Sequence, residues 1–239
     1  MAKFTTLVII PTYNETSNIV PLIEAILKAD PEFDVLVIDD SSPDGTADKV
    51  RELESDDDRV HLLLRPGKLG LGTAHIRGMK WALERDYERV VTMDADFSHP
   101  PEIIPAMVAE SGKSDVVVGS RYIEGGGWKN WPWHRVLISW LANVLTRHAL
   151  GLSAMDCTGA FRCFRRDVLE DIPFEDLKAT GFAFQEEMLF YCKRRGWTIG
   201  EVPIIFHDRR GGTSKITPGE TLSAGWTLLR LLCQRICGR

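Results

Sequence analysis

The chain has few cysteines and no long apolar run. It holds five cysteines, an odd number, and no Cys-x-x-Cys motif, which favours reduced thiols over a disulfide framework. The longest apolar stretch, residues 136–145, is shorter than the about 20 residues that span a bilayer. No N-terminal segment combines basic residues, an apolar stretch and a cleavage site of small residues. We therefore expect a cytoplasmic protein.

An excess of positive charge is also lacking. The formal net charge of −5 argues against a protein that binds nucleic acid. The charge is nevertheless uneven, because residues 129–166 contain six lysines and arginines against the single acid Asp156. This part of the chain is expected either to face an anionic ligand or to form a solvated basic surface.

Segments typical of strands and helices alternate along the chain. Apolar runs rich in β-branched residues cover residues 5–10, 35–38, 60–64, 90–93 and 115–118. Apolar residues at helical spacing follow several of these runs, and polar or glycine-rich loops lie between. This alternation predicts an α/β protein with a mostly parallel, doubly wound sheet and helices on both faces. A chain of 239 residues with 44% hydrophobic content suffices for one such domain.

The most informative motif is a pair of carboxylates, Asp94 and Asp96, directly after the run at 90–93. Open α/β sheets bind their ligands at the carboxyl ends of the strands. Two hard oxygen ligands at that edge suit Mg²⁺ or Mn²⁺ held against a diphosphate, where the ion would neutralise a departing nucleoside diphosphate. Aspartate is also common in turns, so the pair alone leaves open a strand that simply ends in solvent.

Other strand-end loops carry polar groups that would converge on the same edge. Tyr13 could stack on a base, and Glu15 or Asp40 could accept hydrogen bonds from base or ribose. Arg121, after the run at 115–118, could meet phosphate oxygens in bidentate geometry. The glycines of residues 67–72 match neither the dinucleotide-binding nor the P-loop spacing, so those assignments are poorly supported.

Two later segments have the composition of functional loops. Residues 208–215 combine cations with a glycine pair, which fits a mobile phosphate lid, although an exposed basic turn is the alternative. Residues 185–188 open an apolar helix with two acids, which could act as a base or orient an acceptor. Acids are equally favourable at any helix N-terminus, so this second assignment stays open.

Eight segments follow one another in a characteristic order: PTYNE, VIDDSSPDGT, KLGLGTA, MDADFSHPPE, VGSRY, TGAFRCF, QEEM and DRRGGTSK. In this order they resemble the GT-A glycosyltransferases of family 2, and within them the dolichyl-phosphate (polyprenyl-phosphate) mannose synthases. The similarity implies a Rossmann-like GT-A catalytic domain over residues 1–220. Residues 221–239 would form a C-terminal amphipathic helix, packed on the domain or at the membrane interface.

The resemblance implies that the donor, GDP-mannose, binds at the edge of the sheet. Its nucleoside would be held by Pro11, Tyr13, Glu15, Ile38 and Asp40. The rest of the donor would contact Asp94, Ala95, Asp96 and Arg121, together with Arg209 and Lys215 of the lid. The implied metal ligands are Asp94, Asp96 and Ser98. Some members have glutamine in place of Ser98, whose hydroxyl is a weaker metal ligand and could act through water.

The resemblance also assigns the acceptor, dolichyl or polyprenyl phosphate, to Arg121 and Arg135. Residues implied to act in the reaction are Asp96, Arg121 and Glu187, of which Glu187 would position groups. Since a phosphate monoester is largely ionised near neutral pH, with a second pKa of about 6, no dedicated base is needed. A single displacement would invert the donor to a polyprenyl β-mannosyl phosphate.

Two alternatives remain at this stage. The motifs indicate a diphosphate better than a base or sugar, so a polyprenyl-phosphate glucosyltransferase that uses UDP-glucose is the nearest rival. A non-catalytic nucleotide-sugar-binding subunit is the second, although the complete set of phosphate-handling residues disfavours it.

Two amphipathic segments are expected to meet a membrane. Between residues 222 and 236 apolar side chains recur at helical spacing, with Arg230, Arg235 and Arg239 available for anionic headgroups. Residues 131–147 carry three tryptophans. Because a polyprenyl tail stays in the bilayer, we expect a peripheral protein at the cytoplasmic face, alone or with a small membrane-anchoring partner. The alternative is that both helices pack on the core and their arginines are solvated.

Overall fold

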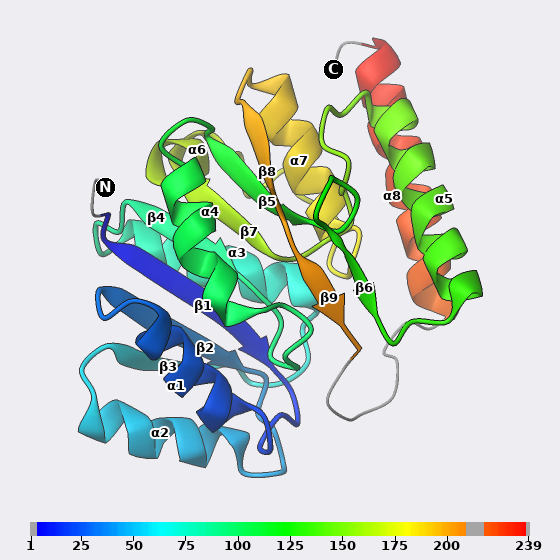
Figure 1. Ribbon diagram of the computed structural model, residues 1–239. Helices are drawn as coiled ribbons and strands as arrows, with labels where there is room; N and C mark the ends of the chain where they lie inside the picture. Colours follow the sequence, from blue (N-terminus) through cyan, green and yellow to red (C-terminus); the bar gives the residue numbers. More distant parts are fainter. Residues whose placement is uncertain (1–3, 209–217, 238–239) are drawn as a thin grey trace.

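A seven-stranded sheet forms the centre of the protein in the computed structural model, which describes residues 4–208 and 218–237. Across the sheet the strands are β3 (Val60–Leu64), β2 (Phe33–Asp39), β1 (Thr6–Thr12), β4 (Arg89–Thr92), β7 (Arg162–Arg165), β5 (Val116–Ser120) and β8 (Ile199–Pro203). Helices cover both faces (Figure 1). The predicted α/β layering is therefore confirmed.

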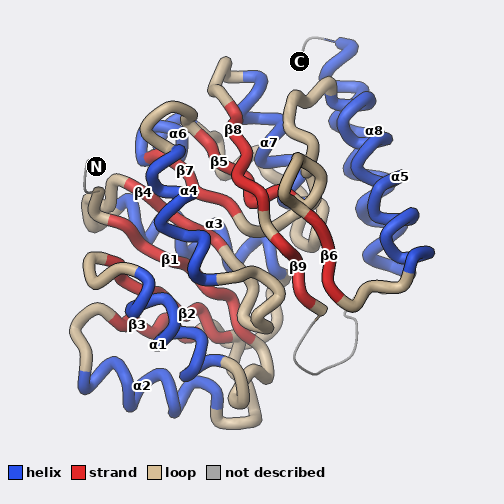
Figure 2. The backbone as a smooth tube through the Cα atoms, viewed as in Figure 1, coloured by secondary structure: helices blue, strands red, loops and turns tan. Residues whose placement is uncertain are grey.

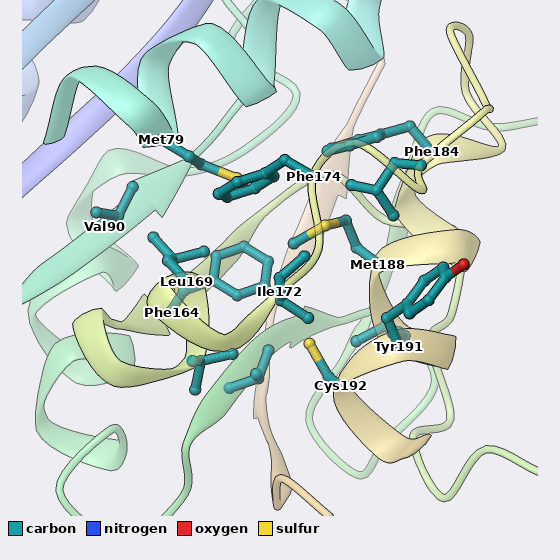
Figure 3. Packing of buried hydrophobic residues seen from close by; sticks show 14 of the residues in the cluster. Met79, Val90, Phe164, Leu169, Ile172, Phe174, Phe184, Met188, Tyr191 and Cys192 are labelled. Atoms are coloured by element: carbon teal, nitrogen blue, oxygen red, sulfur yellow. The ribbon is translucent and has the colours of Figure 1, made fainter. Parts of the chain in front are cut away.

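Each face of the sheet has its own apolar cluster. One face is covered by α1 (Ile19–Ala29), α2 (Thr46–Asp56) and α4 (Ile104–Glu110), which follows the short 3-10 helix Pro101–Ile103. The other is covered by α3 (Leu71–Leu83), α6 (Arg166–Asp171) and α7 (Phe184–Arg194). On this second face Met79, Leu169, Phe174 and Met188 point toward one another (Figure 3). This packing holds α7 and the chain that precedes it against the sheet.

The central strands end together. β1 pairs in parallel with both β2 and β4, which places Thr12 beside Asp39 and Ile9 beside Thr92. The segments that follow these strands therefore meet at one edge of the sheet, as the sequence predicts.

Two strands of the main sheet were not predicted. β7 lies antiparallel between β4 and β5, and β8 pairs in parallel with β5. The sequence of β7, RCFR, has two arginines and reads as a polar segment, and β8 contains a glycine, an acid and a proline. Pairing with the neighbouring strands overrides these weak local preferences.

Helix α3 begins at Leu71, inside the glycine-rich segment 67–72 that was expected to be a loop. Gly70 precedes the helix with a φ of 97°, a conformation that favours glycine. A Cβ atom at Gly70 would lie 2.6 Å from the carbonyl oxygen of Thr180. The start of α3 thus lies directly against the loop that leads to α7.

Two helices and a small second sheet lie outside the main sheet and its covering helices. Helices α5 (Trp133–Leu150) and α8 (Pro218–Cys237) lie side by side at one end of the molecule (Figures 1 and 2). Beside α5, β6 (Gly127–Lys129) and β9 (Ile205–His207) pair in parallel as a small second sheet. The helix predicted from residue 221 is present but begins at Pro218. Within residues 4–208 and 218–237, no helix is long and apolar enough to cross a membrane.

All five cysteines are free thiols, as predicted. Cys157, Cys163 and Cys192 are buried, and burial raises the pKa of each thiol to about 12. These three therefore behave as small apolar side chains. Cys233 and Cys237 are exposed on α8.

Gly78 marks a close approach of α3 to the sheet. A Cβ atom there would lie 2.7 Å from Cδ1 of Ile38 and 2.8 Å from Cγ2 of Ile9. We expect Gly78→Ala to lower the free energy of unfolding by about 1–3 kcal/mol, because overpacking outweighs the helix propensity of alanine. Equilibrium denaturation measures this change. Gly225→Ala in α8 is the matched control, since nothing lies within 4 Å of its added Cβ; an equal loss in both variants would contradict the packing argument.

Candidate active site

A cavity of about 370 Å³ opens at the edge where β1, β2 and β4 end. The beginning of α3 and two residues of the loop before α7 complete its walls. The lining residues are Pro11, Thr12, Tyr13, Glu15, Asp40, Lys68, Gly70, Leu71, Ala74, Asp94, Ala95, Asp96, Gly181 and Phe182. An apolar cleft with a few convergent polar groups is the usual form of a small-molecule site.

The structure brings together most of the residues predicted to bind a nucleotide sugar. Those that line the cavity are Pro11, Tyr13, Glu15, Asp40, Asp94, Ala95 and Asp96. Ile38 does not line the cavity, because its side chain is fully buried in the core on the face of β2 that α3 covers. Arg209 and Lys215 of the predicted lid lie outside the described residues.

Two cations that the motifs did not single out shape the wall near Tyr13. The ammonium of Lys68 lies 3.8 Å from the centroid of the Tyr13 ring. Arg65 binds Asp40 through two hydrogen bonds, with Nη2 2.7 Å from Oδ2, and both side chains are largely buried. This pair fixes the Asp40 carboxylate at the rim of the cavity. Lys68 could have been identified from the sequence, because it begins the KLGLGTA segment. No motif contains Arg65.

The loop that carries the two acids is held from within the protein. The amide of Asp94 donates to Nδ1 of His99 (3.0 Å), and Oδ1 of Asp96 accepts from the amide of Ser98 (3.0 Å). His99 is buried and stacks on Phe161. Burial lowers the pKa of His99, which favours the neutral imidazole that can accept this hydrogen bond. His99 was not among the predicted site residues, although it lies in MDADFSHPPE.

The donor set fits a divalent cation that substrate phosphates also bind. Asp94 and Asp96 bring hard carboxylate oxygens to the cavity. The Ser98 hydroxyl is buried without a hydrogen-bond partner in the described part of the chain and does not line the cavity, so contact through a water molecule suits it. Within the described residues 4–208 and 218–237, no group of three His, Cys, Asp or Glu side chains could hold a metal ion. Substrate phosphate oxygens and water molecules would complete the coordination shell.

Arg121 is bound to an acid that the sequence did not link to it. Its Nε and Nη2 lie 2.6 and 2.7 Å from the two carboxylate oxygens of Asp156. Burial alone would raise the pKa of Asp156, but the guanidinium and the Arg121 and Gly159 amides lower it below its ordinary value. This corrects the expected bidentate phosphate contact, because Asp156 occupies that face of the guanidinium. Arg121 also lines a second cavity of about 290 Å³ beneath α5.

The two other predicted residues lie outside the first cavity. Arg135, in the first turn of α5, lies 3.0 Å from Asp208 and stacks on Trp131, with its centre 3.9 Å from the ring centroid. Glu187 is fully buried in α7 and accepts hydrogen bonds from two backbone amides and from Arg230. Glu187 was expected to position groups. Its carboxylate does not line the cavity but faces the loop before α7.

A buried imidazole lies next to the cavity wall in α3. His75 follows the lining residue Ala74, is fully buried and stacks on Phe184. Neither ring nitrogen has a hydrogen-bond partner in the described residues. Burial, assisted by the charges of Arg162 and Arg65, lowers the pKa of His75 to about 3. The imidazole is therefore neutral over the ordinary pH range.

Comparison with known proteins agrees with this geometry. The sequence model described as Glycosyl transferase family 2 matches residues 7–173. An undecaprenyl-phosphate mannosyltransferase from Micrococcus luteus is 44% identical over 213 residues, which cover 89% of this chain and 88% of that protein. A polyprenol monophosphomannose synthase from Mycolicibacterium smegmatis is 42% identical over 214 residues, which cover 89% of this chain and 81% of that protein.

Solved structures share the fold at lower sequence identity. Glucosyl-3-phosphoglycerate synthase from Mycobacterium tuberculosis, in complex with Mn²⁺, UDP and phosphoglyceric acid, aligns with a TM-score of 0.71 at 19% identity. The alignment covers 96% of this chain and 78% of that one. A mannosyltransferase from Pyrobaculum calidifontis, in complex with GDP-Man and Mn²⁺, aligns with a TM-score of 0.61 at 19% identity, over 99% and 65% of the two chains. These likenesses confirm the predicted GT-A-type architecture.

The burial of His75 predicts a loss of stability in mild acid. Between pH 7 and pH 5 the unfolded chain protonates this imidazole, with an ordinary pKa of 6.5, whereas the folded protein does not. The unfolded state then binds more protons, so this group lowers the free energy of unfolding by about 2 kcal/mol over that range. His75→Leu should remove this part of the pH dependence, as measured by urea denaturation at both pH values. His134→Gln, at an exposed position on α5, is the control; an unchanged pH dependence in His75→Leu would contradict the assignment.

Proposed function

The chain belongs to glycosyl transferase family 2, and we propose that it transfers mannose from GDP-mannose to dolichyl or polyprenyl phosphate. The observation that carries the proposal is the cavity in which Asp94 and Asp96 lie with Tyr13 and Asp40. The sequence around it is 42–44% identical to proteins named for mannosyl transfer to a polyprenyl phosphate or for polyprenol monophosphomannose synthesis. The cavity therefore offers a ring on which a base could stack, Tyr13, together with a pair of acids for the diphosphate, Asp94 and Asp96.

In this proposal Asp94 and Asp96 hold Mg²⁺ or Mn²⁺ against the donor diphosphate, with Ser98 contacting the ion through water. When bound, the ion neutralises charge that develops on the departing GDP. Both structural neighbours described above were solved with Mn²⁺, which supports the assignment. The chain's own part is to place the two carboxylates, and the hydrogen bond from the Asp94 amide to His99 does this before substrate binds.

The nucleoside would lie over Tyr13, between Glu15 and Asp40. The ring of Tyr13 already carries Lys68 on one face, so a base would stack on the remaining ring surface or displace the ammonium. Asp40 is held in place by Arg65 and can still accept a hydrogen bond from ribose, since each carboxylate oxygen has more than one lone pair. Arg209 and Lys215 would contact the donor phosphates.

The acceptor phosphate would approach from the side of α5. Arg135 lies on that helix, and the remaining Nη1 donors of Arg121 supply a second positive group. Asp156 keeps the Arg121 guanidinium in one orientation and offsets the cost of burying its charge. The acceptor oxygen is already ionised, so catalysis would depend on in-line placement, and a single displacement would invert the anomeric carbon.

The outer surface of α5 and α8 supports docking on a membrane. Large apolar side chains are exposed along both helices: Trp133, Leu137, Ile138, Trp140, Leu141 and Leu145 of α5, and Leu222, Trp226, Leu229 and Ile236 of α8. Contiguous apolar surface of this kind marks an interaction face. A polyprenyl acceptor stays in the bilayer, so we propose a peripheral protein on the cytoplasmic face, self-docked or recruited by a small membrane partner.

One assay tests donor and acceptor together. The protein is incubated with polyprenyl phosphate, Mn²⁺ or Mg²⁺ and labelled GDP-mannose or UDP-glucose, and the lipid is extracted. We expect lipid-bound label from GDP-mannose and its loss on chelation. Label from UDP-glucose alone would favour the glucosyltransferase, and the absence of label from either donor would favour a binding subunit.

In the same assay Asp96→Asn should lower the transfer rate at least about a hundredfold, because loss of a metal ligand costs several kcal/mol of transition-state stabilisation. The amide keeps the oxygen that accepts from the Ser98 backbone, so the loop should fold. Asp58→Asn, at an exposed acid remote from the cavity, is the control. Retention of more than a tenth of the rate in Asp96→Asn would contradict the metal role.

Docking predicts cosedimentation with anionic vesicles that weakens as salt rises. Replacing both Trp226 and Leu229 by serine should weaken vesicle binding at least about tenfold, because each buries a large apolar side chain at the interface. Leu64→Ser, at an exposed leucine on the far edge strand β3, should have no effect. Wild-type protein that stays in solution at low salt, with polyprenyl phosphate present, would leave recruitment by a partner as the better explanation.

A further inference from the structure

A single buried carboxylate joins three parts of the protein. Glu187 of α7 accepts hydrogen bonds from the amides of Lys178 (3.0 Å) and Ala179 (2.7 Å). Arg230 of α8 donates to the same carboxylate. Glu187 is fully buried, and a buried charge requires partners such as these. The contact therefore connects α8 to the loop that precedes α7.

That loop forms one wall of the donor cavity. The carbonyl of Thr180 accepts a hydrogen bond from the amide of Gly72 at the start of α3 (2.8 Å). Gly181 and Phe182, the next two residues, line the cavity. These lining residues thus lie two and three residues beyond the Ala179 amide that donates to Glu187.

Helix α8 has two different faces. Thr227 and Leu231 are buried against the protein, whereas Leu222, Trp226 and Leu229 are exposed. Arg230 lies between these faces, with 23% of its side chain exposed, and reaches inward to Glu187. Any interaction that fixes the position of the exposed face of α8 would therefore also favour the contact between Arg230 and the Glu187 carboxylate.

A second arginine of α8 has a different target. Arg235 donates to the backbone carbonyls of His148 and Ala149 in α5. Arg235 thus attaches α8 to α5, whereas Arg230 attaches α8 to Glu187 and, through it, to the loop before α7. Arg235 offers a matched comparison on the same helix.

We propose that Glu187 and Arg230 are positioning residues that transmit the placement of α8 to the wall of the donor cavity. Docking of α8 on a membrane then stabilises the closed wall and tightens binding of the nucleotide-sugar donor. Linkage requires the reverse effect as well, so the donor tightens membrane binding by the same factor. The proposal rests on the proposed function in one respect, that the donor binds in this cavity.

Hydrogen exchange tests the link directly. Arg230→Met removes the cation at similar side-chain length, and we expect exchange of the Lys178 and Ala179 amides to accelerate at least about tenfold. Arg235→Met should change it less than twofold, and Arg230→Lys should restore much of the protection. Thermal unfolding identifies any variant that fails to fold. Unchanged exchange in folded Arg230→Met would overturn the proposal.

The predicted effect on donor affinity is tested by calorimetry, with GDP-mannose and Mn²⁺ as the first ligand and UDP-glucose as the second. For whichever donor binds the wild type, the Kd should rise about tenfold in Arg230→Met, as expected for loss of one charge-assisted contact. The KM for the acceptor should not change. In a Glu187→Gln background Arg230→Met should add nothing, because Arg230 acts through that carboxylate. Additive effects of the two substitutions would overturn the link.

Anionic vesicles provide the last comparison. They should tighten donor binding severalfold in the wild type and in Arg235→Met but not in Arg230→Met. Because binding is read without transfer, a protein that binds donor and transfers no mannose contradicts the proposed function and leaves the link intact. A protein that transfers mannose but shows the same donor Kd with and without Arg230 overturns the link alone.

Discussion

One buried cation organises the part of the structure around β7 and the start of α7. Arg162 of β7 is fully buried, and its guanidinium donates to the carbonyls of Cys157, Gly159 and Gln185. Burial lowers its pKa to about 10, so it remains protonated at neutral pH. The strand, the loop before it and the start of α7 are thereby held together. The Asp156 that binds Arg121 and the Glu187 that binds the donor wall both lie within a few residues of these carbonyls.

Ion pairs then set the positions of the surrounding loops. Asp40 is paired with Arg65, Asp156 with Arg121, and Glu187 with Arg230, and each pair joins segments far apart in the sequence. Such pairs add little net stability, since desolvation offsets attraction, but loss of one partner leaves a buried charge and is costly. Their physical effect is to select one arrangement of the loops. The cavity is therefore shaped before a ligand enters it.

The two functional surfaces lie at different ends of this arrangement. The cavity lies where the parallel strands end, and the apolar faces of α5 and α8 lie beyond the sheet. The proposed function would use such a separation, because a nucleotide-sugar donor would bind the cavity while the tail of a polyprenyl acceptor would stay in the bilayer. The contacts of Glu187 with Arg230 of α8 and with the loop before α7 lie between the two.

Local sequence determined much of this protein. The alternation of apolar runs and helical spacing predicts the strands β1 to β5 and the helices α1 to α3, because side-chain periodicity reflects burial on one face. The parallel arrangement in turn places Asp94, Asp96, Tyr13 and Asp40 at one edge, since polar residues directly follow buried strands.

Tertiary structure decided the rest. Only long-range pairing inserts β7 antiparallel between β4 and β5, and the local sequence RCFR does not indicate it. The Arg121 guanidinium faces Asp156, 35 residues away, and Glu187 faces a loop and α8, 43 residues from Arg230. Motif and spacing identify which charged residues are present, but a buried charge takes whichever partner the packed chain brings within reach. That choice depends on the whole fold and on no local segment.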